Sequence, residues 1–342
     1  MSTWPVNRPR RQRGMGWLEI AVVAALLGLT GCAGQPRLDS TALASLPPAQ
    51  KLSTVPFYPQ SDYQCGPASL AMVLNYNGAN ASPVELRPMV YLPGRQGSLQ
   101  VEMVAAARQY DLLVYPLEQR LDALLQEVNG GNPVLVLQNL GLDWWPMWHF
   151  AVVIGYDLPA RELILHSGLK AEKRESFSSF TNTWERGGRW ARVIVSPEKV
   201  PATAQPLAYV RAAHDLELTG QSDAARVAYG TARSTWPENT AAAFAQANLA
   251  LSQGEYLEAS LGFKKLLALK PAYGPAWNNL AIALGQLGCE SAAAKARACA
   301  LSVTAEHQAG DHPDRVSVRQ TAGVTRQSGV DICKVPACQA ID

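Results

Sequence analysis

The sequence predicts two folded parts, an α+β domain followed by an all-α domain of helical repeats. A length of 342 residues corresponds to about two domains of ordinary size. Between residues 54 and 198, helical patterns come first and short apolar strands follow, which is an α+β order. From 206 to 308 the chain is rich in alanine and repeats itself every 34 residues. Because 48% of the residues are hydrophobic, both parts can bury a core.

The charge of the chain argues against nucleic acid as a partner. The formal net charge of +2 comes from four arginines within the first 31 residues: Arg8, Arg10, Arg11 and Arg13. Without that segment, basic and acidic side chains nearly balance. Binding to a phosphate backbone needs a basic surplus. We therefore expect no nucleic-acid partner.

Residues 1–31 have the pattern of an export signal. The arginines precede an apolar stretch from Trp17 to Leu29, which is shorter than the ~20 residues that span a bilayer. The end of the segment, Leu29-Thr30-Gly31-Cys32, resembles the lipobox of bacterial lipoproteins. The resemblance implies cleavage before Cys32 and acylation of that cysteine, palmitate included, which is enough for stable anchoring. A secretory signal with an incidental cysteine, or an uncut anchor, is the alternative.

The residues after Cys32 indicate where the anchored protein lies. Ala33 rather than an acidic residue follows the cysteine, so the resemblance implies the outer membrane, with the protein facing the periplasm. Residues 32–53 are small and polar and contain Pro47-Pro48, which suits a tether between lipid and domain.

Export sets the expected state of the six cysteines. Thiols in an oxidising compartment pair, and lipidation of Cys32 leaves an odd number. The simplest disulfides are Cys289–Cys299 and Cys333–Cys338. Cys65 is then left as a free thiol. The polar tail, 309–342, is expected to be flexible. Its cysteines and histidines match no standard zinc spacing, and the sequence indicates no metal and no cofactor.

The region 54–198 contains helices and strands in a definite order. Short β-branched runs bounded by Gly, Pro or Asp predict buried strands, and longer periodic runs predict helices. The expected helices are 67–76, 100–110 and 121–128, and the expected strands are 134–137, 150–154, 163–165 and 193–195. Residues 156–160 between two strands predict a hairpin turn.

A proline-punctuated linker, 197–206, leads into the helical repeats. Four kinds of residue recur at a spacing of 34: Gly220, Gly254 and Gly288; Ala225, Ala259 and Ala293; Pro237 and Pro271; Tyr229 and Phe263. The pattern resembles the tetratricopeptide repeat, with a small residue at the turn and alanine where the helices cross. Three repeats over 206–308 imply a concave surface for a peptide or a partner helix, without chemistry of their own. An unrelated alanine-rich bundle is the alternative.

Cys65 stands at the start of a predicted helix. Pro67 suits the first turn, so the thiol is placed at the positive end of the helix dipole, which can lower the pKa of a cysteine. Gly66 is expected to leave room for a substrate carbonyl. His149 opens an apolar strand, from which its ring can reach a helix packed across the sheet. This is a thiol and imidazole pair suited to nucleophilic catalysis, although a buried cysteine that caps a helix is the plainer interpretation.

Two segments carry a family resemblance. Gln60 with Tyr63-Gln64-Cys65-Gly66-Pro67-Ala68-Ser69-Leu70, and His149-Phe150-Ala151-Val152-Val153-Ile154-Gly155-Tyr156-Asp157, resemble the bacteriocin-processing (double-glycine leader) cysteine peptidases, in a lipoprotein branch with tetratricopeptide repeats. The resemblance implies a papain-like domain. In it, Cys65 is the nucleophile and His149 the general base. Gln60 would donate to the oxyanion beside the Cys65 N–H, or it is simply a solvated loop amide.

One position departs from the family pattern. The third member of the family's triad is an Asp on the strand paired with the histidine strand, and this chain has His166 there. A neutral His166 could accept the ring proton of His149, as in the NlpC-type amidases with a Cys-His-His arrangement. A simple Cys65–His149 dyad is the alternative.

These residues leave three functions open. The first is a cysteine peptidase that hydrolyses peptide bonds in peptides or proteins, with the repeats holding substrate or a protein partner. The second is an amidase for peptidoglycan stem peptides, which His166 and the outer-membrane location suggest. The third is a non-catalytic peptide-binding scaffold. The presence of Cys65 favours the two enzymes.

Overall fold

The computed structural model describes residues 43–60, 64–95 and 97–310, all within one compact unit, 38–342. The predicted signal peptide, Cys32, and the tail residues Cys333 and Cys338 lie outside the described residues. Among the helices that are described, none is both long and apolar enough to cross a membrane.

The N-terminal part is built on one antiparallel sheet. Its strands follow the order β4-β9-β5-β6-β7-β8, and β1 pairs with β6. Their bounds are β1 Ala49–Lys51, β4 Leu113–Pro116, β5 Val134–Asn139, β6 Trp148–Asp157, β7 Glu162–Ser167, β8 Lys170–Ser176 and β9 Ala191–Val195. A separate pair is formed by β2, Tyr91–Leu92, and β3, Gly97–Ser98. The four apolar strands expected from the sequence are all present, as is the turn between β6 and β7.

Strand β6 is the centre of this sheet. Its first six residues pair with β5, from Asn139↔Trp148 to Val134↔Val153. Its last three residues pair with β1, from Lys51↔Gly155 to Ala49↔Asp157. The sequence analysis assigned residues 49–51 to the tether 32–53, whereas the structure shows them as strand β1. A strand of only three residues has too short a pattern to be predicted from sequence.

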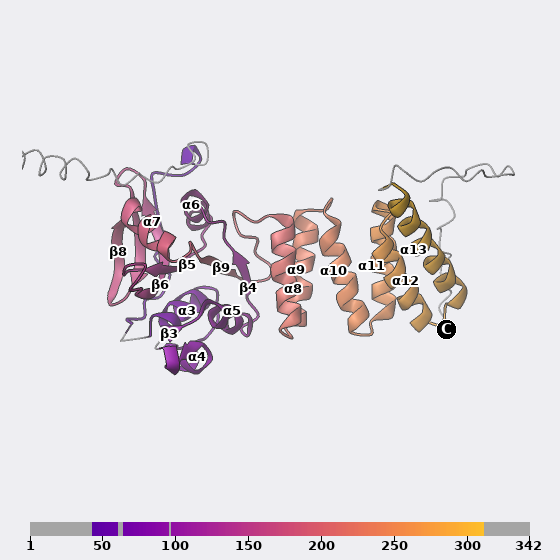
Figure 1. Ribbon diagram of the computed structural model, residues 1–342, viewed down its shortest axis with the longest axis horizontal. Helices are drawn as coiled ribbons and strands as arrows, with labels where there is room; N and C mark the ends of the chain where they lie inside the picture. The colour runs from indigo at the N-terminus through magenta and orange to yellow at the C-terminus, as the bar shows by residue number, and fades with distance from the viewer. Residues whose placement is uncertain (1–42, 61–63, 96, 311–342) are drawn as a thin grey trace, which may run out of the picture. The chain divides into compact units, whose positions relative to one another are not determined.

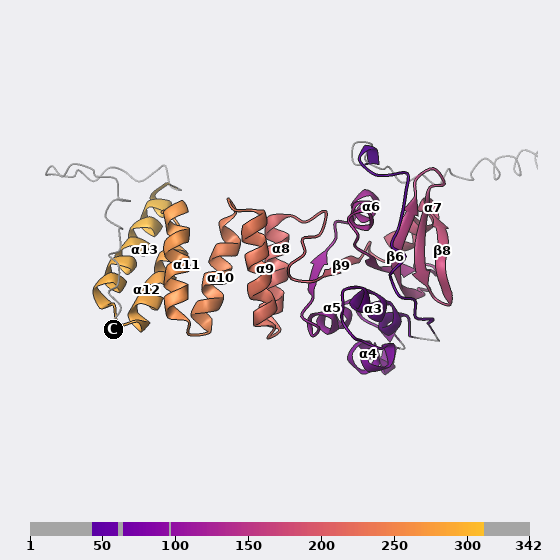
Figure 2. The ribbon, with the colours of Figure 1, turned by 180° about the vertical axis from the view of Figure 1, so that it is seen from behind.

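Helices lie on both sides of the sheet. They are α3 Cys65–Tyr76, α4 Pro83–Val90, α5 Gln100–Arg108, α6 Leu121–Asn129 and α7 Phe177–Arg186. In both ribbon views the strands lie between α6 and α7 on one side and the group α3, α4 and α5 on the other (Figures 1 and 2). Helix α3 is central, because its residues 66–74 are all buried.

The predicted helices are confirmed, with small changes at their ends, but two helices were missed. Helix α4 begins with a complete capping box in which Ser82 and Glu85 bond reciprocally, a signal that the sequence displayed. Helix α7 is capped by Ser176, whose hydroxyl accepts the Ser179 N–H at 3.2 Å. In α4 only Leu86 and Val90 are buried, so its apolar period is weak, whereas α7 buries Phe177, Phe180 and Trp184 at helical spacing, a signal that the sequence analysis did not use.

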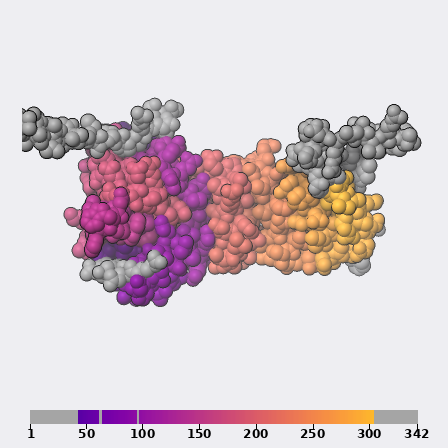
Figure 3. Space-filling view, viewed as in Figure 1, coloured from indigo at the N-terminus to yellow at the C-terminus, as the bar shows by residue number. Residues whose placement is uncertain are grey.

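The C-terminal part consists of helical hairpins. The helices are α8 Pro206–Leu218, α9 Ser222–Thr235, α10 Thr240–Ser252, α11 Tyr256–Leu269, α12 Gly274–Gln286 and α13 Glu290–Gly310. Successive helices pack on each other, and Figure 3 shows the surface they present, in orange to yellow.

The glycines of the 34-residue period end the first helix of each hairpin. Gly220, Gly254 and Gly288 have φ of +87°, +78° and +75°, a conformation that favours glycine. The same two backbone bonds recur at each, for instance Gly254 N–H to Leu251 O at 3.2 Å and Glu255 N–H to Ala250 O at 2.9 Å. The periodic Ala225, Ala259, Ala293, Tyr229 and Phe263 are all 0% exposed. The repeat in sequence is therefore a repeat in structure.

The predicted linker is fixed to the N-terminal part. The carboxylate of Glu127 in α6 is fully buried. It accepts the Thr203 N–H at 2.7 Å, the Thr203 hydroxyl at 2.5 Å and the Ala202 N–H at 3.1 Å. The Asn132 amide donates to it at 2.6 Å. Because a buried carboxylate needs such partners, it holds the linker in place.

Candidate active site

Cys65 is the first residue of α3 and meets the start of β6. The first bond within the helix is the Ala68 N–H to the Gln64 carbonyl at 3.1 Å, so the N–H groups of Cys65 and Gly66 point out of the helix. These two N–H groups and that of Phe150 favour the ionised sulfur. Ser69, one turn after Cys65, donates to the Phe150 carbonyl at 3.1 Å, which sets the start of α3 against the strand of the predicted base. Among the described cysteines, Cys65 is the free thiol.

Burial sets the pKa of Cys65. It raises the pKa above the usual value for a thiol, and the N–H groups of Phe150, Gly66 and Cys65 itself oppose the shift only in part. The sequence-based expectation of a lowered pKa is therefore wrong. The helix N-terminus is present as expected, but removal of the sulfur from water outweighs it. The resting side chain is a thiol.

His149 is held by a hydroxyl from the neighbouring strand. Its Nε2 lies 2.9 Å from the Oγ of Ser167, at the end of β7. Burial and the nearby Lys173 lower the pKa of His149 to about 4, against the opposing effect of Glu175. The ring is therefore neutral at neutral pH. With the ring proton on Nε2 and donated to Ser167, Nδ1 is the nitrogen that can accept a proton.

His166 does not contact His149, which corrects the Cys-His-His expectation. Its Nε2 lies 3.2 Å from the carbonyl of Val55, and its Nδ1 accepts the Glu172 N–H at 3.2 Å. The sheet register explains this. His166 is paired with Val152, three residues from His149, and side chains alternate between the two faces of a strand. His166 therefore faces away, and Ser167 faces His149.

Gln60 is tied to the first turn of α3. Its side chain is buried, and its Oε1 accepts the Gly168 N–H at 3.0 Å. Its Nε2 donates to Ser69 Oγ at 3.0 Å, and Ser69 donates to the Phe150 carbonyl at 3.1 Å. Ser69 lies one helical turn after Cys65, so Gln60 stands beside that turn and is not a solvated loop amide. An amide nitrogen carries two hydrogens, so one N–H remains after the bond to Ser69.

Gly66 has a different role from the one expected. A Cβ at this position would lie 2.2 Å from Ser98 Oγ and 3.3 Å from Met103 Sδ. The glycine therefore allows β3 and α5 to pack against the start of α3. The position that a Cβ of residue 66 would take is thus filled by protein.

Several polar residues around His149 were missed from the sequence. Lys173 and Glu175 on β8 form an ion pair at 3.2 Å, and the Ser179 hydroxyl donates to Glu175 at 3.0 Å. Gln138 lies opposite His149 on β5, and its Nε2 donates to Thr183 Oγ1 at 2.7 Å. Strand β8 is polar along its length, which hid it from a search for apolar strands. Ser69 could have been recognised from the sequence, because a polar hydroxyl inside an otherwise apolar helix indicates a specific hydrogen bond.

The comparisons with known proteins concern this same region. Residues 52–191 match the model of the Peptidase_C39 like family. The match supports a papain-like cysteine peptidase. Among solved structures, a protein from Bacillus anthracis described as a C39-like peptidase is 20% identical, with a TM-score of 0.38, over 45% of this chain and 98% of that one. No curated protein matches the chain.

Cys289 and Cys299 lie outside residues 52–191, and each is disulfide-bonded. The Cys289 carbonyl accepts the Ala293 N–H at 2.9 Å, so Cys289 begins helix α13 and Cys299 lies within it. Ten residues of helix span about 15 Å, and a disulfide needs Cα atoms within about 7 Å. The predicted bond between these two cysteines is therefore wrong.

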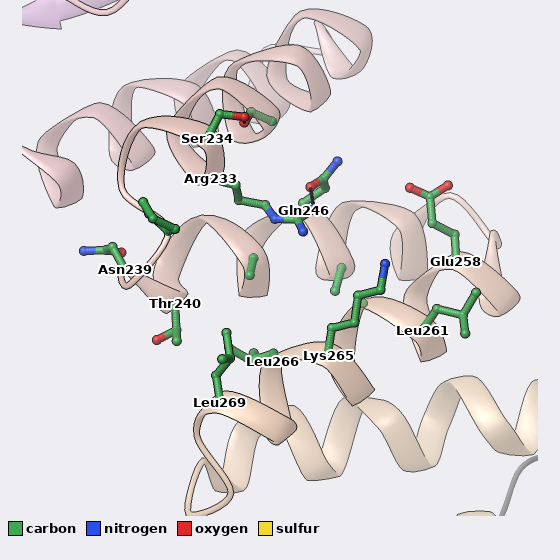
Figure 4. A pocket seen from close by; sticks show the side chains of 15 residues that line it. Arg233, Ser234, Asn239, Thr240, Gln246, Glu258, Leu261, Lys265, Leu266 and Leu269 are labelled. Atoms are coloured by element: carbon green, nitrogen blue, oxygen red, sulfur yellow. Dashed lines mark hydrogen bonds between the residues drawn. The ribbon is translucent and has the colours of Figure 1, made fainter.

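Two pockets among the described residues lie away from Cys65 and His149. One of about 560 Å³ is lined by α9, α10 and α11 (Figure 4). Another, of about 280 Å³, lies at the far end of β6, beside Ala49 and Asp157. Neither is lined by Cys65 or His149. No group of histidine, cysteine and acidic side chains suited to a metal ion occurs in the described part of the chain.

Proposed function

We propose that the protein hydrolyses peptide bonds with Cys65 as nucleophile and His149 as general base. The observation that supports this best is the hydrogen bond of 3.1 Å from Ser69, one turn after Cys65, to the Phe150 carbonyl, which sets the helix of the free thiol against the histidine strand. The Ser167 bond at 2.9 Å fixes the ring that would take the proton. Together they give a nucleophile and a base whose orientation is held by a third group.

The pKa directions indicate how the reaction begins. A thiol with a raised pKa and an imidazole with a lowered pKa are both neutral at neutral pH. The thiol proton therefore moves to Nδ1 of His149 as sulfur attacks the carbonyl carbon. The N–H of Cys65 and the remaining N–H of Gln60 would hold the oxyanion. The imidazolium then protonates the leaving amine, and water, deprotonated by His149, releases the acid product and the thiol.

A peptide library tests this function. Products of the wild-type protein would be compared with those of Cys65→Ala and His149→Ala by mass spectrometry. His214→Ala is the matched control, because His214 is an exposed histidine on α8. We expect cleavage by the wild type and the control, and none by the two site variants. Cleavage that survives Cys65→Ala would refute the mechanism. Peptide binding without cleavage would support the scaffold alternative.

The amidase alternative loses its structural support. One of its two grounds was His166 as a third catalytic group, and that ring is bonded to Val55 and Glu172. The other ground, the outer-membrane location, does not depend on the geometry of the site. Incubation with purified sacculi still separates the two enzymes. Release of stem peptides by the wild type but not by Cys65→Ala would favour the amidase.

We also propose that the chain is exported and anchored by lipid on Cys32 at the outer membrane, facing the periplasm. The lipobox-like sequence supports this, and the disulfide-bonded Cys289 and Cys299 agree with an oxidising compartment. Metabolic labelling with a palmitate analogue tests it. We expect the wild-type protein to carry the label. We expect the Cys32→Ser variant to carry none and to be missing from the outer-membrane fraction.

We propose further that the helical hairpins are tetratricopeptide repeats that bind substrate or a protein partner. The buried 34-residue positions support the repeat, and the pocket of about 560 Å³ offers a surface. In Figure 4 Lys265 stands near Leu261 and Leu266 at its wall, and Arg233 bonds Gln246 at 2.7 Å. The two cations outnumber the one carboxylate of this pocket, that of Glu258, and with the leucines they suit an acidic, partly apolar segment. Charge reversal at Arg233 and Lys265 should reduce the recovery of cross-linked partners.

A further inference from the structure

The turn between β5 and β6 exposes an unusual group of large apolar side chains. Six of its residues are exposed, from 41% for Leu140 to 78% for Trp144. They are Leu140, Leu142, Trp144, Trp145, Met147 and Trp148. Below we call residues 139–148 the aromatic hairpin. Isolated exposed apolar residues are ordinary, but a cluster of this kind usually marks a binding surface.

The backbone of the aromatic hairpin is ordered by hydrogen bonds. The side-chain oxygen of Asn139 accepts the N–H of Gly141 at 3.0 Å and of Met147 at 2.9 Å. Leu142 and Trp145 exchange two backbone bonds of 3.1 Å. A Cβ on Gly141 would lie 2.3 Å from the Trp145 carbonyl, so this close turn requires glycine. The apolar side chains are thus held outward on a preformed frame, which lowers the entropy lost on binding.

The aromatic hairpin rises directly from the candidate active site. Trp148 precedes His149 in the chain, and the pairs Asn139↔Trp148 and Gln138↔His149 are adjacent in the ladder. At about 3.3 Å per residue, Trp145 at the tip lies within about 13 Å of His149. An extended peptide covers that distance with about four residues. Side chains flanking a bond held at Cys65 can therefore reach the hairpin.

Charge and topology favour a peptide over a bilayer as the occupant. Asp143 is the single charged residue within the aromatic hairpin, and it is an acid, which offers nothing to anionic lipid headgroups. Strand β1, through which the N-terminal segment enters the sheet, pairs with the opposite end of β6. From Gly155 to His149 the strand runs about 20 Å. The hairpin is thus remote from the end at which a lipid tether would enter.

We propose that the aromatic hairpin binds the apolar side chains of the substrate, and that the substrates are peptides with leucine or aromatic residues within about four positions of the cleaved bond. This rests on the proposed peptidase function, whose site supplies the bond that is cut. The hairpin then selects the peptide, while Cys65 and His149 perform the chemistry.

The kinetic test uses two fluorogenic peptides with the same scissile bond. One has leucine and phenylalanine beside that bond, and the other has serine and glycine. The double variant Trp144→Ser/Trp145→Ser is compared with Val84→Ser, a matched control that replaces a single exposed apolar residue on α4. We expect the ratio of kcat/KM for the apolar to the polar peptide to fall about tenfold in the double variant, a usual effect of losing apolar contacts. An unchanged ratio would overturn the proposal.

A binding test separates this proposal from the peptidase function. Fluorescence anisotropy with the labelled apolar peptide is measured on Cys65→Ala, with and without the tryptophan substitutions. We expect the substitutions to raise Kd about tenfold whether or not the wild type cleaves any peptide. Equal Kd values would overturn the proposal even if the protein is a peptidase. Vesicles of phosphatidylethanolamine and phosphatidylglycerol complete the set, because tryptophan-dependent binding to them alone would indicate a bilayer contact instead.

Discussion

Nε2 of His149 lies 2.9 Å from the hydroxyl of Ser167, on the strand where the family resemblance leads one to expect an acid. A hydroxyl can fix the tautomer and orientation of the ring, which an aspartate would also do. It supplies no negative charge to stabilise the imidazolium that forms when the thiol proton is transferred. The site is thus one in which the ring is positioned without an acid.

This relationship predicts the effect of replacing Ser167. Ser167→Ala should lower kcat about fivefold with little change in KM, because a hydrogen bond of about 1 kcal/mol that orients the base is lost. Ser167→Thr keeps the hydroxyl and should retain more activity. Ser167→Asp should raise the pKa of His149 and move the acidic limb of the kcat profile to higher pH. Identical pH profiles for all four proteins would contradict a positioning role.

The pKa of Cys65 predicts its reaction with iodoacetamide. Burial raises that pKa, so at pH 6 the thiolate fraction is smaller than in an exposed cysteine. Alkylation at Cys65 should be slower at pH 6 than for the same protein unfolded in urea, and its rate should still be rising above the pH at which an exposed thiol is fully ionised. Mass spectrometry of the Cys65 peptide measures both rates. Fast alkylation of the folded protein at pH 6 would show a thiolate instead.

Much of the site could be predicted from the sequence, because short sequence patterns determine the helix and the strand on which its residues lie. Pro67 and the apolar run after it locate the helix that begins at Cys65, and the buried strand after His149 locates the base. The choice between His166 and Ser167 could not be made in this way. It depends on which residue of β7 pairs with Val152, and a shift of one residue exchanges the two faces.

Two other features, the direction of the Cys65 pKa shift and strand β1, depend on tertiary packing that the sequence alone does not show. The helix N-terminus and burial act on the Cys65 pKa in opposite directions, and only the packing of α3 against β6 shows that burial is larger. Strand β1 was missed because residues 49–51 have no apolar pattern and are ordered by pairing with β6. The turn glycines at the 34-residue period, in contrast, were found at once, because their conformation is a local property.

Lys173 provides a test of the electrostatics around His149. Its ammonium group lowers the pKa of His149, second in effect to burial. Lys173→Met should therefore raise that pKa from about 4, and the acidic limb of the activity profile should move to higher pH with it. Titration of the His149 ring by NMR measures the shift directly. Arg174→Met is the matched control, because Arg174 bonds Asp157 and Glu162 instead. A shift of equal size in both variants would contradict the assignment.

Glu127 predicts how firmly the linker is held. Its buried carboxylate accepts two hydrogen bonds from Thr203, one from Ala202 and one from Asn132, at 2.5 to 3.1 Å. Glu127→Ala leaves several buried donors without acceptors, each of which costs about 1–3 kcal/mol. We expect the free energy of unfolding to fall by about 3 kcal/mol or more in urea denaturation. Glu118→Ala, at an exposed ion pair with Arg120, should change it by less than about 0.5 kcal/mol. If the two variants were equally stable, the linker would be held by apolar contacts such as those of Val200 and Ala204, which pack against the core.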